Sequence, residues 1–245
     1  MSSSPSRLTL TLTLLAGVLA VSTASIFIKF AQNEGAPSIV IAAYRLTIAS
    51  LVLAPLALTR YRTGLRALSR KQWTLALLSG TFLALHFAVW ITSLQYTSVA
   101  SSVVLVTTTP LWVALLSPLI LHERIGRTAV LGLILALTGG LVVGLSDSCI
   151  WQAGGVTCPT LQVFLGGTAF LGDFMALFGA WMAAGYILVG RKLREKLELI
   201  PYIFVVYSMA AVVLVAILFG IGAKPFGYSP LVYLWFMLLA LCARK

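Results

Sequence analysis

A single arginine lies inside a long apolar stretch of the sequence, where a charged side chain is costly. Arg45 is the one charged residue of 38–59, which reads SIVIAAYRLTIASLVLAPLALT. A charge at the centre of a membrane-spanning helix costs about 2.5–3.5 kcal/mol, so such a residue is by default a candidate for function. Its place in the stretch puts it about 10 Å below one end of a helix. We expect Arg45 to line a cavity; the alternative is structural pairing or a side chain that reaches the headgroups. Tyr44 cannot share a helix face with Arg45, so one of the two should pack.

Other polar and aromatic side chains in the apolar stretches are candidates to bind a substrate with Arg45. His86 lies at a similar depth in 73–94, and Trp90 follows one turn later on the same helix face. For His86 the alternative is a hydrogen-bonded packing residue. Trp181 and Tyr186 are further candidate cavity aromatics on a later stretch.

A run of hydroxyl side chains precedes a proline in the middle of another apolar stretch. Residues 107–110 read Thr-Thr-Thr-Pro. The proline removes one backbone hydrogen bond and kinks the helix, so freed carbonyls and hydroxyls can meet polar groups of a substrate. Thr108 and Thr109 are therefore candidate binding residues. The alternative is a structural kink in which the threonines bond back to the helix.

Acidic side chains are scarce in these stretches. Asp173 and Glu34 fall at helix ends, where Asp173 is expected to cap the helix that follows, and Lys29 is expected to act as an interface anchor. Basic groups without buried acids suit a substrate with a carboxylate or a phosphate. A carboxylate proton relay is not expected, and His86 is the candidate if a proton is coupled to transport.

No pattern in the sequence indicates catalysis, a cofactor or a metal. The three cysteines, Cys149, Cys158 and Cys242, have no metal-ligand spacing, and no glycine-rich phosphate loop or pair of carboxylates occurs. We therefore expect a protein that is not an enzyme and has no catalytic residue, metal site or cofactor.

Composition points to a protein of the membrane. Hydrophobic residues make up 60% of the 245 residues and charged residues 9%, whereas soluble domains have about a quarter charged. Apolar runs near twenty residues predict seven membrane-spanning helices, and a final run of about 16 Å predicts part of an eighth. The predicted helices are 8–30, 38–59, 73–94, 98–121, 128–145, 173–189, 202–221 and 231–241.

The basic residues alternate between the loops in a way that predicts orientation. With a cytoplasmic N-terminus, 14 of the 17 lysines and arginines fall in cytoplasmic segments. This placement accounts for the net charge of +11, so binding to nucleic acid is not expected. Cys149 and Cys158 then face the outer, oxidising side, where a disulfide is one of two outcomes. Expected partners are the lipid bilayer and a small-molecule substrate, and a homodimer is an open alternative.

A weak internal repeat relates the two parts of the chain. Residues 39–44 read IVIAAY and residues 202–207 read YIFVVY, each just after a proline. Five helices precede the long connection, so a second set of five would enter the membrane in the opposite orientation, as in many secondary transporters. The predicted fold is an all-α polytopic membrane protein, an inverted repeat of five-helix bundles. We expect a first repeat at 1–145, an outer loop at 146–172 and an incomplete second repeat at 173–245.

Taken together in order and spacing, several short stretches make the chain resemble the drug/metabolite transporter superfamily, EamA type. They are Ala43-Tyr44-Arg45 with Pro55-Leu56, Tyr96-Thr97-Ser98-Val99-Ala100, Thr109-Pro110-Leu111-Trp112, Glu123-Arg124 with Gly132 and Gly139-Gly140, and Gly172-Asp173 through Ala184 into Arg191-Lys192.

The resemblance implies ten helices in two halves and a carrier of small organic solutes, often outward. Since the family pattern continues beyond helix eight, we expect that this chain stops inside that helix. The predicted function is a secondary transporter, an exporter of amino-acid-like or other carboxylate solutes by alternating access in a bacterial inner membrane. The alternatives are an exchanger of organophosphates or nucleotide sugars, and a passive pore.

Overall fold

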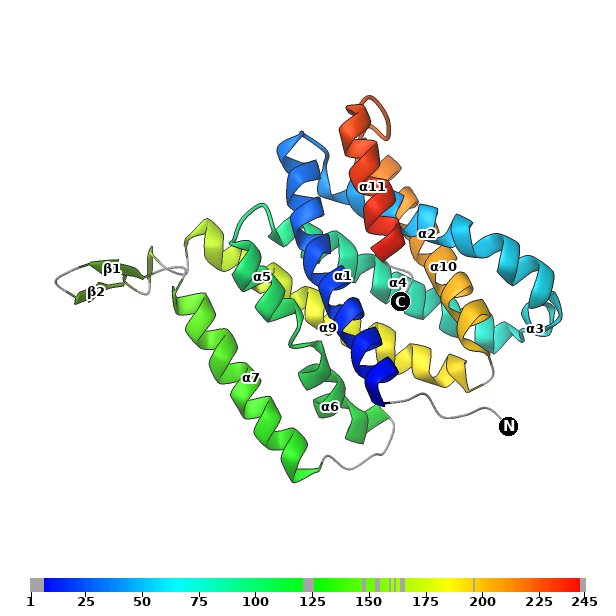
Figure 1. The fold of residues 1–245 in the computed structure, drawn as a ribbon, viewed down its shortest axis with the longest axis horizontal. Helices are drawn as coiled ribbons and strands as arrows, with labels where there is room; N and C mark the ends of the chain where they lie inside the picture. The colour runs from blue at the N-terminus through cyan, green and yellow to red at the C-terminus, as the bar shows by residue number, and fades with distance from the viewer. Residues whose placement is uncertain are drawn as a thin grey trace.

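The protein is a bundle of helices with one short β-hairpin (Figure 1). The computed structural model describes residues 7–120, 126–146, 149–152, 155–158, 160, 162–163, 166–195 and 197–242. The elements in chain order are α1 (Arg7–Asn33), α2 (Ser38–Arg60), α3 (Arg62–Arg66), α4 (Arg70–Ser93), α5 (Val99–Val106), α6 (Thr109–Ile120), α7 (Arg127–Ser146), β1 (Ile150–Gln152), β2 (Gly155–Thr157), α9 (Thr168–Arg194), α10 (Leu199–Gly220) and α11 (Pro230–Cys242).

Each predicted apolar stretch is helical, which confirms a multi-pass helical membrane protein. In the described part of the chain, five helices are long and apolar enough to cross a membrane. They are α2, α4, α5 with α6, α9 and α10. The predicted count of seven full spans and a partial eighth, and the repeat, stay predictions.

Helix boundaries follow local signals in the sequence. Ser69 begins α4 with a capping box, in which the Gln72 N–H donates to Ser69 Oγ at 3.3 Å and the Ser69 N–H donates to Gln72 Oε1 at 2.7 Å. Pro110 interrupts the predicted helix 98–121, which divides at Thr107 and Thr108 into α5 and α6.

The structure contains short elements that the sequence did not predict, and it begins one helix earlier than predicted. α3 was not predicted, because its five residues, Arg-Thr-Gly-Leu-Arg, are too few to show an apolar pattern. The connection at 146–172 contains the β1–β2 hairpin, antiparallel with Trp151 opposite Val156. α9 begins at Thr168, and its N-cap is Gly167. Asp173 therefore lies inside the helix and does not cap it.

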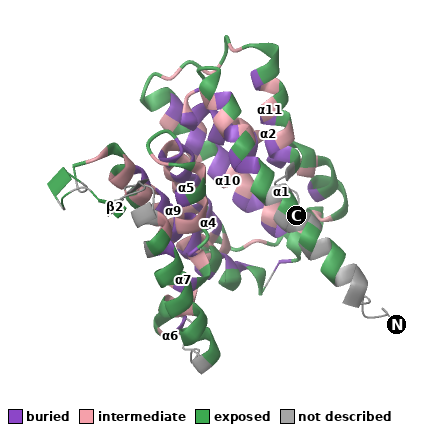
Figure 2. Ribbon diagram, turned by 60° about the vertical axis from the view of Figure 1, so that its left-hand side comes forward, coloured by how far each residue is buried: buried purple, intermediate pink, exposed green. Residues whose placement is uncertain are grey.

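The core forms where α4 packs on α9 and where α10 packs on α2 and α4, and Figure 2 shows buried residues along these helices. α4 and α9 pack along most of their length in antiparallel directions. Two glycines of α9 allow this close approach. A methyl group on Gly172 would lie 2.8 Å from Thr97 Cβ, and one on Gly179 would lie 3.3 Å from Trp90 Cβ.

α7 lies at one side of the bundle and packs mainly against α5 (Figures 1 and 2). Gly132, Ala136, Gly140 and Gly144 recur every four residues in the sequence of this helix, a spacing typical of a closely packed seam. Gly140 does approach Leu105 Cδ2 at 3.8 Å, but the Cβ position of Gly132 has no atom within 4 Å. The seam is therefore closely packed at Gly140 and open at Gly132.

The two ends of the bundle differ in charge. The basic end carries the end of α2, α3, the start of α4 and the end of α9, with residues such as Arg60, Arg70 and Arg191. The hairpin end carries the turns at 34–37, 94–98 and 221–229 and the β1–β2 hairpin. All described loops therefore alternate between a basic end and a hairpin end, in the way that the basic residues of the sequence predict.

Candidate functional site

Arg45 of α2 is buried in the core, and its side chain faces α4. Its side chain is 6% exposed, and its guanidinium carbon lies 4.5 Å from the centre of the Phe87 ring. A cation over an aromatic face is attracted by the ring, by about 2 kcal/mol or more when the pair is desolvated. The aromatic ring of α4 thus provides a favourable environment for this charge in the core.

Tyr44 points to a different neighbour, as its position next to Arg45 requires. Its ring stacks on Phe236 of α11 at 4.7 Å, and its hydroxyl donates to the carbonyl of Pro225 at 3.1 Å. Tyr44 therefore joins α2 to α11 and to the turn before it, and does not share a site with Arg45.

His86 and Trp90 lie on one face of α4, with nearly parallel rings 5.9 Å apart. His86 Nδ1 is 2.9 Å from the carbonyl oxygen of Gly179. Because a carbonyl can only accept, Nδ1 carries a hydrogen, and in the neutral ring Nε2 is then an acceptor. Trp90 is 6% exposed, and its Nε1–H is buried without a hydrogen-bond partner in the described structure. This face thus offers one acceptor and one unused donor.

Arg45, Phe87, His86 and Trp90 together form a group that we call the arginine–aromatic cluster. Phe87 connects its members, since its ring also lies 4.7 Å from His86 and 6.2 Å from Trp90. Sequence reasoning missed Phe87, because an apolar ring in an apolar helix carries no signal. The cluster combines two groups that can donate hydrogen bonds, the guanidinium of Arg45 and the indole N–H of Trp90, with aromatic walls.

The threonines at the break between α5 and α6 bond back to their own helix. The hydroxyls of Thr107, Thr108 and Thr109 donate to the carbonyls three residues earlier, at 2.9, 2.6 and 2.8 Å. Their hydrogens are therefore engaged, and a ligand could use only the oxygen lone pairs. Trp112 Nε1 already donates to Thr108 Oγ1 at 3.2 Å.

Trp181 of α9 lies beside this break and packs edge-on against Trp112 at 5.2 Å. Its Nε1–H is buried and makes no hydrogen bond in the described structure. Thr108 also lines a mainly apolar cavity of about 320 Å³ between α5 and α7, with Val104, Thr107, Ala136, Gly139, Gly140 and Val143. Thr108, Trp112 and Trp181 thus form a second group, the threonine–tryptophan cluster, to which sequence reasoning did not assign Trp112.

Tyr186 lies in neither cluster. It is half-buried on α9, where its backbone carbonyl accepts a hydrogen bond from Ser79 Oγ of α4 at 3.2 Å. Of the predicted binding residues, the structure therefore brings together Arg45, His86 and Trp90 as one set, and Thr108 and Trp181 as another. Thr109 is adjacent to the second set.

Polar groups at the hairpin end serve the fold. Lys29 Nζ donates to the carbonyl of Leu94 at 2.6 Å, and Gln32 Nε2 donates to that of Ile91 at 2.7 Å. These carbonyls end α4 and have no partner within the helix. Lys29 thus caps a neighbouring helix, a role that differs from the interface anchor we expected. A disulfide joins Cys149 to Cys158 across the ends of the hairpin.

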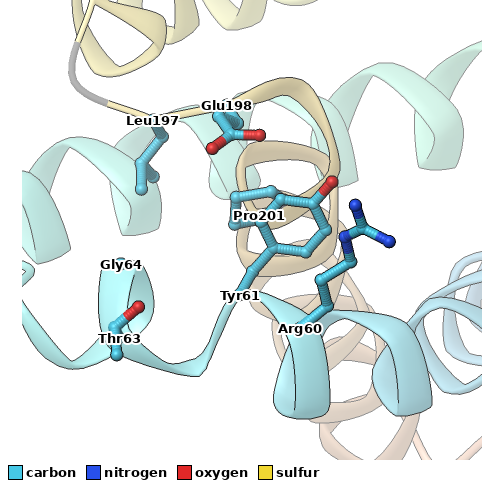
Figure 3. A pocket seen from close by; sticks show the side chains of 7 residues that line it. All are labelled: Arg60, Tyr61, Thr63, Gly64, Leu197, Glu198 and Pro201. Atoms are coloured by element: carbon cyan, nitrogen blue, oxygen red, sulfur yellow. The ribbon is translucent and has the colours of Figure 1, made fainter.

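A cavity of about 360 Å³ opens at the basic end, and sequence reasoning missed it (Figure 3). The end of α2 and the start of α3 contribute one wall, and the segment from α9 to α10 contributes the other. The lining residues are Arg60, Tyr61, Thr63, Gly64, Leu197, Glu198 and Pro201. Arg60 had been explained by membrane orientation alone, and nothing in the sequence indicated that it lies near Glu198.

Comparisons with known proteins agree with this architecture. No curated protein matches the chain. A protein of known crystal structure, published as "Crystal structure of protein", has a similar fold, with a TM-score of 0.59 and 18% identity over 92% of this chain and 74% of the other. The sequence model of the EamA-like transporter family matches residues 8–145. Because this match covers more than half of the chain, the protein belongs to the EamA-like transporter family.

Proposed function

We propose that the protein is a secondary transporter that exports small organic solutes with a carboxylate, such as amino-acid-like molecules, by alternating access. Membership of the EamA-like family and five apolar helices indicate a membrane transporter of small solutes. The substrate class, the direction and the mechanism are the proposal. We also propose a bacterial inner membrane, with the basic end in the cytoplasm and the Cys149–Cys158 disulfide on the oxidising side.

The packing between the two parts of the chain supports an inverted repeat. If α1, α2 and α4 correspond to α9, α10 and α11, the contacts between these two sets of three helices occur in matching pairs. The contact of α4 with α9 corresponds to that of α11 with α1. The contact of α4 with α10 corresponds to that of α11 with α2, and the contact of α2 with α10 corresponds to itself. A two-fold axis through the contact of α2 with α10 would produce this pattern. Transporters with such repeats place their substrate between the repeats.

The observation that carries the substrate class is Arg45 of α2, buried beside Phe87 of α4. The five candidate spans contain one acidic residue, Asp173, at the hairpin end, where it accepts a hydrogen bond from Thr97 Oγ1 at 2.7 Å. A guanidinium forms two parallel hydrogen bonds to a carboxylate, and such charge-assisted bonds are strong in a dry site. A carboxylate substrate would thus complement the charge of the cluster.

The function can be tested by comparing solutes in the medium and the cytosol of cells with and without the protein. We expect a carboxylate-bearing solute to rise in the medium and fall in the cytosol. A phosphorylated solute would favour the exchanger of organophosphates or nucleotide sugars. Unchanged solutes, or a general leak of unrelated small molecules as from a pore, would contradict the proposal.

A further inference from the structure

Two opposite charges line the cavity at the basic end without meeting. Arg60 ends α2, and Glu198 lies at the N-cap of α10, where its side chain makes no capping hydrogen bond. Among the described contacts, no ion pair joins the two residues. Figure 3 shows the carboxylate of Glu198 above the Tyr61 ring and the guanidinium of Arg60 to one side of it. One charge belongs to the first part of the chain and the other to the second part, so the cavity lies between one segment of each part.

At the hairpin end the same two parts are in direct contact. The hydroxyl of Tyr44 donates to the carbonyl of Pro225 at 3.1 Å, and the hydroxyl of Thr97 donates to Asp173 Oδ1 at 2.7 Å. Gly172 is pressed against the backbone of Thr97. Hydrogen bonds therefore join the two parts at the hairpin end. At the basic end, beside the contact of α4 with α9, a cavity lies between the α2–α3 segment and the segment that leads from α9 to α10.

We propose that Arg60 and Glu198 are the two halves of a gate, and that they pair when this cavity closes and the contacts at the hairpin end open. The proposal rests on alternating access, which belongs to the proposed function. An ion pair suits a gate because exposed pairs are weak, so that a charge change shifts a balanced equilibrium about two- to fivefold without locking it.

Each charge also has a simpler explanation, which the experiment must distinguish from a gate. Arg60 agrees with the excess of basic residues on the cytoplasmic side. Glu198 sits at the start of α10, where a negative charge interacts favourably with the helix dipole. Under either explanation, the effect of changing one residue does not depend on the charge of the other. The quantity to measure is therefore the coupling between Arg60 and Glu198.

The experiment measures how fast a cysteine in the cavity reacts with a membrane-impermeant maleimide. Thr63→Cys in a Cys242→Ser background is the reporter, in vesicles that expose the basic end. Four proteins are compared with this background: Arg60→Glu, Glu198→Arg, the double exchange of both charges, and a neutral pair, Arg60→Gln with Glu198→Gln. The matched controls are Arg62→Glu and Glu195→Arg, two exposed charges that do not line the cavity.

We expect each single reversal to raise the labelling rate about two- to fivefold, because like charges then hold the cavity open, and the double exchange to restore the background rate. High salt should raise the rate in the background protein and leave the neutral pair unchanged. The gate is refuted if the single reversals have the same labelling rates as the controls. It is also refuted if the effect of the double exchange on the labelling rate is only the combined effect of the two single reversals. The salt comparison needs no charge reversal, so it decides the question even if a reversed variant does not fold.

Transport measured on the same proteins separates this proposal from the proposed function. If labelling shows the coupling but no variant or parent moves any solute, the coupled pair stands and the transporter proposal fails. If the parent exports a carboxylate and labelling shows no coupling, the transporter proposal stands and the gate fails.

Discussion

Replacing Arg45 should remove the preference for a carboxylate while leaving a folded protein in the membrane. The side chain is 6% exposed and lies 4.5 Å from the Phe87 ring, so a substrate that reaches it would bind in a dry site. A hydrogen bond to a charged group is worth about 1.5–3 kcal/mol, which corresponds to a rate loss of about 10- to 150-fold in Arg45→Ala. Arg45→Lys keeps the charge but loses the planar fork, so we expect an intermediate loss.

The assay compares initial rates for the exported acid and for its neutral amide in proteoliposomes. Arg45→Ala should lower the rate for the acid and leave that for the amide nearly unchanged, so that the two rates become similar. Arg62→Ala removes an exposed arginine of α3 and should leave both rates unchanged. Arg45→Leu removes the cost of burying a charge, so its yield in the membrane should not fall below that of the parent. An Arg45→Ala protein that still prefers the acid would refute the assignment of Arg45 to the substrate.

Three further predictions follow from the packing and the polar groups. Gly172→Ala places a methyl group 2.8 Å from Thr97 Cβ and should destabilise the protein by about 1–3 kcal/mol in a thermal unfolding assay, whereas Gly132→Ala, in open space, should have little effect. Trp90→Phe keeps the aromatic packing and removes the unused N–H donor, so it should raise the KM for substrate with unchanged yield; an unchanged KM would exclude this donor from binding. Cys149 and Cys158 should react with an impermeant thiol reagent from the hairpin side after reduction and not before, and reaction without a reductant would show that the disulfide is absent.

The positions of the helices could be predicted because a membrane imposes simple rules on a sequence. A long apolar run has few alternatives to a helix, and Pro110 indicated where one helix divides. The start of α9 was placed too late because Gly172 and Asp173 resemble a helix boundary, whereas Gly172 is needed inside α9 for close contact with Thr97. The three-residue strands of the hairpin are too short to show alternation.

The site could be predicted in part. Arg45 and His86 stand out because polar groups are rare in apolar helices, and a helix wheel places Trp90 with His86. The direction of each side chain depends on which helices meet, and no local pattern records that. Phe87 contacts Arg45 only because α2 packs against α4. The cavity at the basic end is lined by residues that are far apart in the chain.

Counterflow in proteoliposomes tests the central claim most directly. Vesicles are loaded with the carboxylate solute identified in the medium, and the same solute in labelled form is added outside at low concentration. A carrier with a single alternating site should take up the label transiently above its equilibrium level, and the Arg45→Ala protein should lose this overshoot. Label that approaches equilibrium without an overshoot would indicate a pore, and uptake equal to that of empty vesicles would contradict transport of that solute.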